Sequence, residues 1–266
     1  MNYYPERIVC LTEETTETLY LLGEQDRIVG ISGFTVRPKQ ARKEKPKVSA
    51  FVDAKIDEIL DLKPDLVIGF SDIQADIAKD LISKGITVWV NNHRSVDDIF
   101  KMMVQLGALV GKAKEALALV SHFQNRIQEI KTITSQWGIK PKVYFEEWYD
   151  PLISGIQWVN ELIEIAGGED VYKENSLESL AKNRIIEHQE EVIQKNPDII
   201  LASWCGKKFK PKKMLARKAW NEIKAIQDGE VYEIDSSIIL QPGPASVSEG
   251  LEILHRIFHN WVKKQS

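Results

Sequence analysis

This sequence of 266 residues lacks the motifs of several kinds of catalytic, nucleotide-binding and metal site. No GxGxxG or GxxxxGK[ST] motif follows an apolar run, so the glycine-rich loops that cradle nucleotide phosphates are not indicated. The sequence has neither a GxSxG elbow nor a CxxC pair, which leaves a hydrolase nucleophile, a zinc ribbon and a redox pair without support. No window approaches 18 consecutive apolar residues, so no membrane span is predicted.

Positive charge and cysteine are also scarce. The net charge is −4, which argues against a basic nucleic-acid surface. Local basic runs occur, such as KKFKPKK at 207–213, and we interpret them as solvated loops. Cys10 and Cys205 lie far apart, so both are expected to be free thiols. The start, MNYYPERIVCL, does not resemble a secretory signal, and we expect a cytoplasmic protein unless a leader has been removed.

The most regular stretch lies near the middle of the chain, at 112–136. It contains no proline or glycine, and Gly138 and Pro141 follow it as stop signals. Its apolar positions recur at spacings of 4, 3, 4 and 3, as on one stripe of an amphipathic helix. These positions are Ala116, Val120, Phe123, Ile127 and Ile130. The stretch predicts one helix of about 25 residues, long for a globular protein.

Apolar runs alternate with helical patterns on both sides of this helix. Before it, the sequence predicts strands at 7–11, 28–31, 65–70 and 87–90, and a polar loop at 33–47. Helices are predicted at 12–22, 55–62, 71–84 and 95–109, three of them with an N-cap, at Thr12, Ser71 and Ser95. Such alternation is typical of a parallel sheet flanked by helices.

The second half continues in the same order. Strands are predicted at 142–146, 198–202 and 230–234, and helices at 157–166, 186–195 and, capped by Ser246, 246–263. The fold class is therefore α/β, with two lobes that each hold a mainly parallel sheet. We divide the chain into an N-terminal lobe, 1–111, a connecting helix, 112–138, and a C-terminal lobe, 139–266.

An internal repeat supports two equivalent lobes. The segment DEILDLKPDLVIG at 57–69 aligns with EEVIQKNPDIILA at 190–202, an offset of 133. The segment ETLYLLG at 17–23 likewise resembles ELIEIAG at 161–167, with an offset of 144. Two matches at similar offsets favour a duplication, although a helix, a Pro-Asp pair and a strand also form a common α/β junction.

Parallel sheets bind ligands beyond the carboxyl ends of their strands, so we expect a site in a cleft between the two lobes. Residues at these ends in the first lobe are Phe34, Arg37, Phe51 and Phe70. Those in the second lobe are Glu147, Trp148, Tyr149, Trp204, Cys205 and Gln241. Aromatic side chains with a few polar groups suit a large, flat, partly apolar molecule. The alternative is that these aromatics belong to the core or to lobe contacts.

Reactive residue types give weaker signals. His255 and His259 share one helix face, but a glutamate of the HExxH type is lacking and we interpret them as a packing pair. Cys205 follows a strand and is a candidate nucleophile, though an unreactive cysteine is favoured. Glu146 and Glu147 are adjacent in a strand, so at most one faces the cleft.

Each lobe also places an acidic pair near the start of an equivalent helix. These pairs are Asp57-Glu58 and Glu190-Glu191. A carboxylate there interacts favourably with the helix dipole, which is one explanation. The other is that Asp57 and Glu190 are acidic contacts presented symmetrically to a basic partner.

Nearly the whole chain resembles the helical-backbone class of periplasmic substrate-binding proteins. The motifs that carry the resemblance are RIVCLTEETTETLYLLG, KPDLVIGF, GITVWV, ISGIQWVNELIEIAGGEDVY, NPDIILAS and WNEIKAIQDGEVYEID, followed by PGPASVSEGLEIL. This family serves ABC importers of vitamin B12, haem and iron-siderophores, and the sequence is most similar to its B12-binding branch. The resemblance implies two α/β lobes on one backbone helix, whose stiffness allows only a small lobe movement on binding.

The resemblance also implies roles for individual residues. Phe34, Phe51 and Phe70 match aromatic positions around the corrin, and Asp57 and Glu190 match carboxylates that bind arginines of a dimeric ABC permease. The pattern departs at three positions, where this chain has Arg184, Ser237 and Gln241. Trp148 and Trp204 are expected to compensate for the lost contacts.

The leading hypothesis is a non-enzymatic protein that binds a corrinoid-like ligand for an ABC importer, without a catalytic residue, cofactor or metal. Orientation of the ligand would come from Arg37, Glu147, Tyr149, Arg184 and Gln241. Two alternatives remain: a haem or ferric-siderophore binder, and a cytoplasmic corrinoid-handling chaperone or enzyme that uses Cys205 or Glu147. Family resemblance implies a periplasmic or cell-surface location if a leader was removed.

Overall fold

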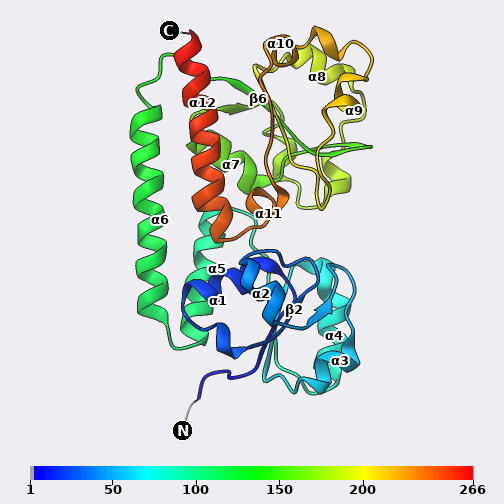
Figure 1. Ribbon diagram of the computed structural model, residues 1–266, viewed down its shortest axis with the longest axis vertical. Helices are drawn as coiled ribbons and strands as arrows, with labels where there is room; N and C mark the ends of the chain where they lie inside the picture. The colour runs from blue at the N-terminus through cyan, green and yellow to red at the C-terminus, as the bar shows by residue number, and fades with distance from the viewer. Residues whose placement is uncertain (1–2, 266) are drawn as a thin grey trace. The chain divides into compact units, whose positions relative to one another are not determined.

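The computed structural model describes residues 3–265, which form two compact units. Unit 1 consists of the chain up to His93 together with Asp97–His122 and Pro242–Pro244. Unit 2 consists of Arg94–Val96, Phe123–Gln241 and the chain from Ala245 onward. Each unit contains a five-stranded sheet flanked by helices, which confirms the predicted α/β class (Figure 1).

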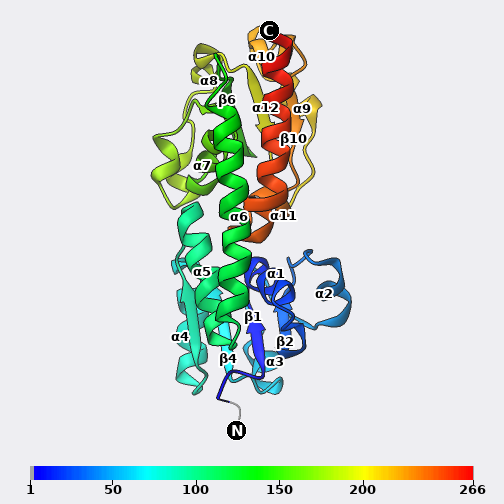
Figure 2. The same ribbon diagram turned by 90° about the vertical axis from the view of Figure 1, so that its left-hand side faces the viewer.

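The sheet of unit 1 is entirely parallel, with the strand order β3-β2-β1-β4-β5 (Figure 2). Its strands are β1 (Ile8–Cys10), β2 (Ile28–Ser32), β3 (Lys47–Ser49), β4 (Leu66–Phe70) and β5 (Val88–Asn91). All residues of β1 and β4 are buried, as expected for central strands that helices cover on both faces.

Side chains that alternate along β1 divide the core of unit 1. Val9 and Leu11 pack with Ile59 and Leu81 on one face, and Ile8 and Cys10 are buried on the other. The helices of this unit are α1 (Glu13–Leu21), α2 (Lys39–Glu44), α3 (Ile56–Asp61), α4 (Ala75–Ser83) and α5 (Val96–Leu109). Helices α3 and α4 cover the first face, because they supply its buried leucines and isoleucines (Figure 1).

The sheet of unit 2 has the order β10-β9-β6-β7, and β8 also pairs with β6. Its strands are β6 (Lys142–Tyr149), β7 (Leu152–Ser154), β8 (Glu169–Asp170), β9 (Ile199–Ala202) and β10 (Val231–Glu233). All pairs are parallel except that β7 runs antiparallel to β6. The mainly parallel sheet predicted for this half is therefore present.

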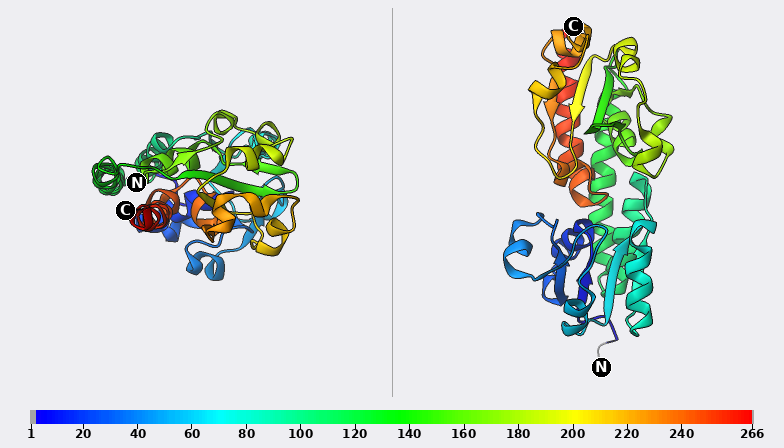
Figure 3. Two further views of the ribbon diagram at one scale, coloured as in Figure 1. Left: turned by 90° about the horizontal axis from the view of Figure 1, so that it is seen from above. Right: turned by 90° about the vertical axis from the view of Figure 1, so that its right-hand side faces the viewer.

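Helices also cover both faces of the unit 2 sheet. They are α7 (Gln157–Ile165), α8 (Glu190–Lys195), α9 (Pro211–Leu215), α10 (Lys224–Gln227), α11 (Ser236–Ile239) and α12 (Leu251–Gln265). Tyr144 and Ile200 pack towards α8 and α9, with Val192 and Met214 in the same cluster. On the other face, α12 lies beside the second half of α6, where Arg126 forms an ion pair with Glu252 (Figure 3).

The long helix α6 spans Ala113–Thr134 and contributes residues to both units (Figure 2). All five positions of its predicted apolar stripe are buried, with exposed fractions from 0 to 8%. The observed helix is slightly shorter than the predicted 112–136, because Ser135 and Gln136 lie in a turn. The periodicity of the sequence thus identified the buried side of this helix.

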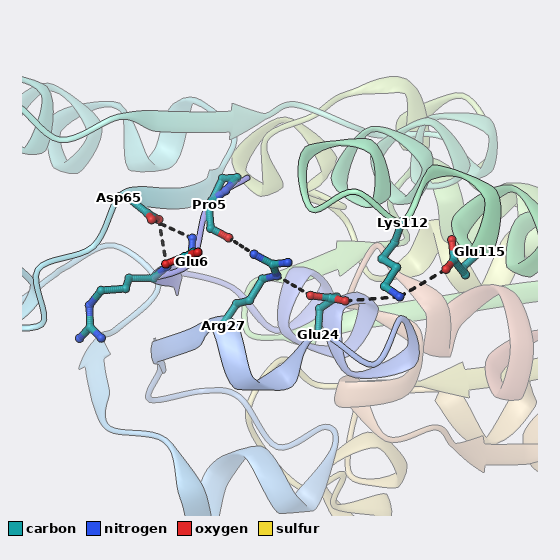
Figure 4. Close-up of polar contacts among 8 residues, drawn as sticks. Pro5, Glu6, Glu24, Arg27, Asp65, Lys112 and Glu115 are labelled. Atoms are coloured by element: carbon teal, nitrogen blue, oxygen red, sulfur yellow. Dashed lines mark hydrogen bonds and ion pairs between the residues drawn. The ribbon is translucent and has the colours of Figure 1, made fainter. Parts of the chain in front are cut away.

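Polar contacts hold the start of α6 within unit 1 (Figure 4). Lys112 Nζ lies 3.3 Å from a Glu115 oxygen and 3.7 Å from Glu24 Oε1. Glu24 also pairs with Arg27, whose Nη1 donates to the Pro5 carbonyl at 2.6 Å. This chain of contacts connects the N-terminal segment to the helix.

The two units share a strand topology, as the sequence repeat predicted. The order β2-β1-β4-β5 in unit 1 corresponds to β8-β6-β9-β10 in unit 2. The aspartate of the repeated Pro-Asp pair also makes equivalent hydrogen bonds to the backbone in both units. Asp65 accepts hydrogen bonds from the amides of Glu6, at 2.7 Å, and Arg7, at 3.0 Å (Figure 4). Asp198 accepts from the Lys142 amide at 2.9 Å, and in both units the carboxylate fixes the start of the neighbouring strand.

Several local predictions were wrong. The loop predicted at 33–47 holds α2 and leads into β3, and β7 was not predicted. Helix α8 begins at Glu190 rather than at 186.

The predicted helix caps differ in outcome. Thr12 occupies the N-cap of α1, but its hydroxyl donates to Glu14 Oε1 instead of capping. Ser246 lies inside a π-helical turn that continues into α12, so it does not cap that helix. Ser71 does accept from the Ile73 amide, as predicted.

Candidate functional site

Three aromatic side chains gather at the carboxyl ends of β6 and β9, and we call them the aromatic platform. The ring centroids of Trp148 and Tyr149 lie 5.0 Å apart, and those of Tyr149 and Trp204 lie 4.3 Å apart. Trp204 is only 2% exposed, whereas Trp148 and Tyr149 are half-buried. The accessible part of the platform is therefore formed by Trp148 and Tyr149.

The pairing of β6 with β7 is irregular just before the two accessible residues of the platform. Neighbouring side chains of a regular strand point to opposite faces. The register between β6 and β7 shifts between Glu146 and Trp148, and such a bulge re-aims the side chains that follow it. This bulge was not predicted, because β7 itself was not predicted.

Glu146 is a fully buried carboxylate behind the platform, with an exposed fraction of 0%. Arg217 binds it through both terminal nitrogens, at 2.6 and 3.0 Å. The Trp204 indole Nε1 donates to Oε1 at 3.0 Å, and the Tyr144 hydroxyl donates to Oε2 at 3.1 Å. Burial and the nearby Glu146 charge raise the pKa of Tyr144 well above its usual value, so the phenol remains a donor. The network fixes the orientation of Trp204.

Glu147, the next residue along β6, pairs with a different arginine. Both oxygens of Glu147 accept from Arg184, at 2.7 and 3.1 Å, and Arg184 is only 1% exposed. Arg184 also donates to the Ser154 carbonyl. Glu146 and Glu147 thus bind different arginines, and the statement that at most one of them faces the cleft stays a prediction. The structure brings together two predicted ligand contacts, Glu147 and Arg184, whose charges compensate each other.

Cys205 lies next to the platform with an exposed side chain, and its amide donates to the Glu147 carbonyl at 3.3 Å. Desolvation by the surrounding protein and the charge of Glu147 raise the pKa of its thiol. A reactive cysteine needs the opposite shift, because the thiolate is the nucleophile. Cys10 is buried in β1, and both thiols are free, as predicted. Gln241 is half-buried, beyond the end of α11.

The predicted residues of unit 1 differ in accessibility. Phe34 is 58% exposed and Phe51 is 39% exposed, so both rings are available for contact. Phe70 is buried and packs edge-on against His93, with centroids 5.0 Å apart. Arg37 Nε donates to Glu17 Oε1 at 3.2 Å. Contact of these four residues with a ligand stays a prediction.

The start of α1 contains two buried carboxyl groups whose burial was not predicted. Glu13 and Glu14 are 3% and 2% exposed. Desolvation raises the pKa of Glu13 to about 8 and that of Glu14 to about 7. Hydrogen bonds from the Val36 amide at 3.2 Å and the Thr12 hydroxyl at 2.5 Å oppose this shift only in part. The sequence TEETTE reads as a solvated helix start, and only the fold reveals its burial.

The acidic residues of the repeat lie where predicted, in the first turns of α3 and α8. Asp57 and Glu190 are both exposed. Their sequence neighbours differ, because Glu58 pairs with Lys55 at 2.9 Å while Glu191 is half-buried. Asp57 and Glu190 are therefore accessible to a partner.

Among residues 3–265, no three His, Cys, Asp or Glu side chains come together as metal ligands, and no helix is long and apolar enough to cross a membrane. His255 and His259 pack with Trp137, whose ring centroid lies 5.7 and 6.0 Å from theirs. The histidine pair is a packing pair, as predicted.

The family model described as periplasmic binding protein matches residues 8–238, most of both units. The chain belongs to this periplasmic binding protein family. The predicted resemblance is thereby confirmed. As a periplasmic binding protein, the chain is of the ABC transporter type, and the family is made of solute-binding proteins rather than enzymes.

Individual relatives of this periplasmic binding protein agree with the assignment. It is 29% identical over 264 residues to the uncharacterized ABC transporter substrate-binding lipoprotein YvrC of Bacillus subtilis, covering 94% of this chain and 79% of the relative. It is 26% identical over 254 residues to the vitamin B12-binding protein of Vibrio parahaemolyticus, covering 93% and 88%. The periplasmic heme-binding protein RhuT of Roseiflexus, at 19% identity, has the same fold, with a TM-score of 0.83 over 97% and 99% of the chains.

Proposed function

We propose that this periplasmic binding protein captures a large, partly planar small molecule of the corrinoid class for an ABC importer. The observation that carries the proposal is the aromatic platform at the carboxyl ends of β6 and β9, where parallel sheets bind ligands. Trp148 and Tyr149 present half-buried rings that suit stacking on a flat ring system. Relatives named for vitamin B12 support the corrinoid class.

The remaining predicted contacts fit this proposal. Phe34 and Phe51 offer exposed rings in unit 1, and the ion pair of Glu147 and Arg184 stabilises the end of β6, which carries two residues of the platform. Binding by stacking and apolar burial requires no catalytic group or cofactor. Cys205 has a raised thiol pKa, which weakens the alternative of an enzyme that uses it as a nucleophile.

Titration of the tryptophan fluorescence with cyanocobalamin tests the proposal. We expect saturable quenching, and Trp148→Ala should weaken binding about five- to tenfold, because a lost stacking contact costs about 1 to 1.5 kcal/mol. Trp89→Leu is the matched control, since Trp89 lies within β5 and away from the end of that strand. If neither cyanocobalamin, haemin nor a ferric siderophore binds, the proposal is wrong. Binding of haemin or the siderophore alone would favour that alternative class.

We further propose that Asp57 and Glu190 dock the protein onto its permease, outside the cytoplasmic membrane. Both carboxylates are exposed in the first turns of equivalent helices. Asp57→Arg and Glu190→Arg should abolish uptake of the ligand by the source cells while leaving its Kd unchanged. Asp61→Arg, at the other end of α3, is the control for a charge reversal. Fractionation of these cells tests the location, and a purely cytoplasmic protein would contradict it.

A further inference from the structure

The basic segment 207–213 is held against the aromatic platform. Its lysines are exposed, but Phe209 is 6% exposed and its ring packs edge-on to Trp204, with centroids 5.1 Å apart. The Phe209 amide donates to Glu233 Oε1 at 2.8 Å. The sequence predicted a solvated loop here, and this is wrong for Phe209, which anchors the segment. The anchor keeps the neighbouring lysines beside Trp148 and Tyr149.

Two of these lysines lie over the accessible rings. Lys207 Nζ is 4.8 Å from the centroid of Trp148 and 5.9 Å from that of Tyr149. Lys213 Nζ is 4.2 Å from the centroid of Tyr149. A cation–π contact at an exposed site contributes only about 0.5 to 1 kcal/mol. Either ammonium group can therefore leave its ring when a negatively charged group approaches.

The segment carries an excess of positive charge in an acidic protein. It has five lysines, whereas the whole chain has a net charge of −4. Across the described residues, no carboxylate lies within 4.0 Å of any of these five ammonium groups. The two glutamates nearest in the strand, Glu146 and Glu147, each already bind an arginine. The lysines repel one another, and an anion beside the platform would relieve that repulsion.

We infer that the ligand is an anion: a partly planar molecule with at least two carboxylate or comparable acidic groups on its rim, which bind Lys207 and Lys213. This inference rests on the proposed function and narrows its ligand class to molecules that carry free acidic groups, such as corrinoids with unamidated carboxylates, because a carboxamide has no charge to pair with an ammonium group. When an acidic group draws Lys207 from Trp148, it frees the ring face for stacking. Charge pairing and stacking thus reinforce each other at one site.

The test compares probes that share a ring and differ in charge. Protoporphyrin IX carries two free propionate carboxylates, and its dimethyl ester has the same ring without these charges. Cyanocobalamin adds a second probe without free carboxylates, and a ferric tris-catecholate adds a second anion. We expect an anionic probe to bind most tightly. Its Kd should rise about tenfold between about 50 and 500 mM NaCl, because exposed ion pairs are screened by salt.

Variants assign this dependence to the two lysines. Lys207→Gln combined with Lys213→Gln should weaken the anionic probe about tenfold and leave the neutral probes within about twofold. Lys84→Gln with Lys140→Gln removes the same charge at exposed positions elsewhere and should have no effect. If a neutral probe binds most tightly, with no change in salt or in the lysine variant, the inference fails and the proposed function stands. If no probe binds, both fail.

Discussion

Arg217 donates a hydrogen bond to Glu146 from each of its two terminal guanidinium nitrogens, at 2.6 and 3.0 Å, although the two residues are 71 positions apart in the sequence. The carboxylate is completely buried and the side chain of Arg217 is 12% exposed. Glu146 also accepts hydrogen bonds from Trp204 and Tyr144, so one carboxylate binds three side chains. The pair is therefore a structural support for the aromatic platform rather than a candidate for direct ligand contact.

Removal of one partner of this pair should be costly. Glu146→Leu leaves the Arg217 charge and two other donors unpaired, and we expect the free energy of unfolding to fall by about 3 to 5 kcal/mol. Glu252→Leu breaks the exposed pair with Arg126 and should cost at most about 1 kcal/mol. Urea unfolding followed by circular dichroism measures both. Equal decreases in the free energy of unfolding of the two variants would show that Glu146 does not support the platform.

The buried carboxyl groups of α1 predict an unusual pH dependence. The pKa of Glu13 is raised to about 8 in the folded protein, so the folded state binds its proton more tightly than the unfolded state does. The resulting stability is complete below about pH 4.5 and is lost as the pH rises to about 8, at up to about 1.4 kcal/mol per pH unit. Glu13→Gln should flatten this decline in urea unfolding between pH 5 and 8. Glu174→Gln, at an exposed position, should not.

The repeated Pro-Asp pair makes a prediction about an exposed residue. Asp65 is exposed, yet its carboxylate accepts two backbone hydrogen bonds at the start of β1. Because charge-assisted bonds of this kind contribute about 1.5 to 3 kcal/mol, Asp65→Ala should lower the free energy of unfolding by that amount. Asp61→Ala, also exposed, should change it by less than about 0.5 kcal/mol. A melt in which the two variants behave alike would contradict this role.

The lysines beside the platform should leave a spectroscopic mark on Tyr149. A hydrogen bond from Lys213 and the charges of Lys207 and Lys213 lower the pKa of its phenol. In the Lys207→Gln, Lys213→Gln variant, this pKa should rise towards its usual value of about 10. Ultraviolet difference titration against Tyr149→Phe isolates the signal of this residue. An identical titration in the wild type and the variant would place the lysines away from the ring.

Much of the fold could be predicted from the local spacing of apolar residues in the sequence. Buried apolar runs identified β1, β4 and β9, and the stripe on α6 was correct at all five positions. Strand ends then indicated Trp148 and Tyr149, because a parallel sheet places its carboxyl ends at one edge. Arg217 was missed, since nothing near it in sequence shows that it reaches Glu146.

Burial explains the other differences. Glu13 and Arg184 are residues of charged types that are mostly exposed in proteins, yet the fold encloses both. Helix α2 and strand β3 lie in a segment rich in lysine and arginine, and β3 is only three residues long, with Val48 as its apolar residue. These features depend on contacts between distant segments, and a single sequence does not display them.

The division of the chain has a consequence for its synthesis. Unit 1 includes Pro242–Pro244, and His93 Nε2 lies 2.8 Å from the Pro242 carbonyl, 149 positions later. Gly243 packs against Glu14 so closely that a Cβ at this position would lie 2.4 Å from the Glu14 Cβ. Most of unit 2 is therefore translated before the last piece of unit 1 emerges from the ribosome. The first sheet and its helices stay incompletely assembled until residues 242–244 have been made.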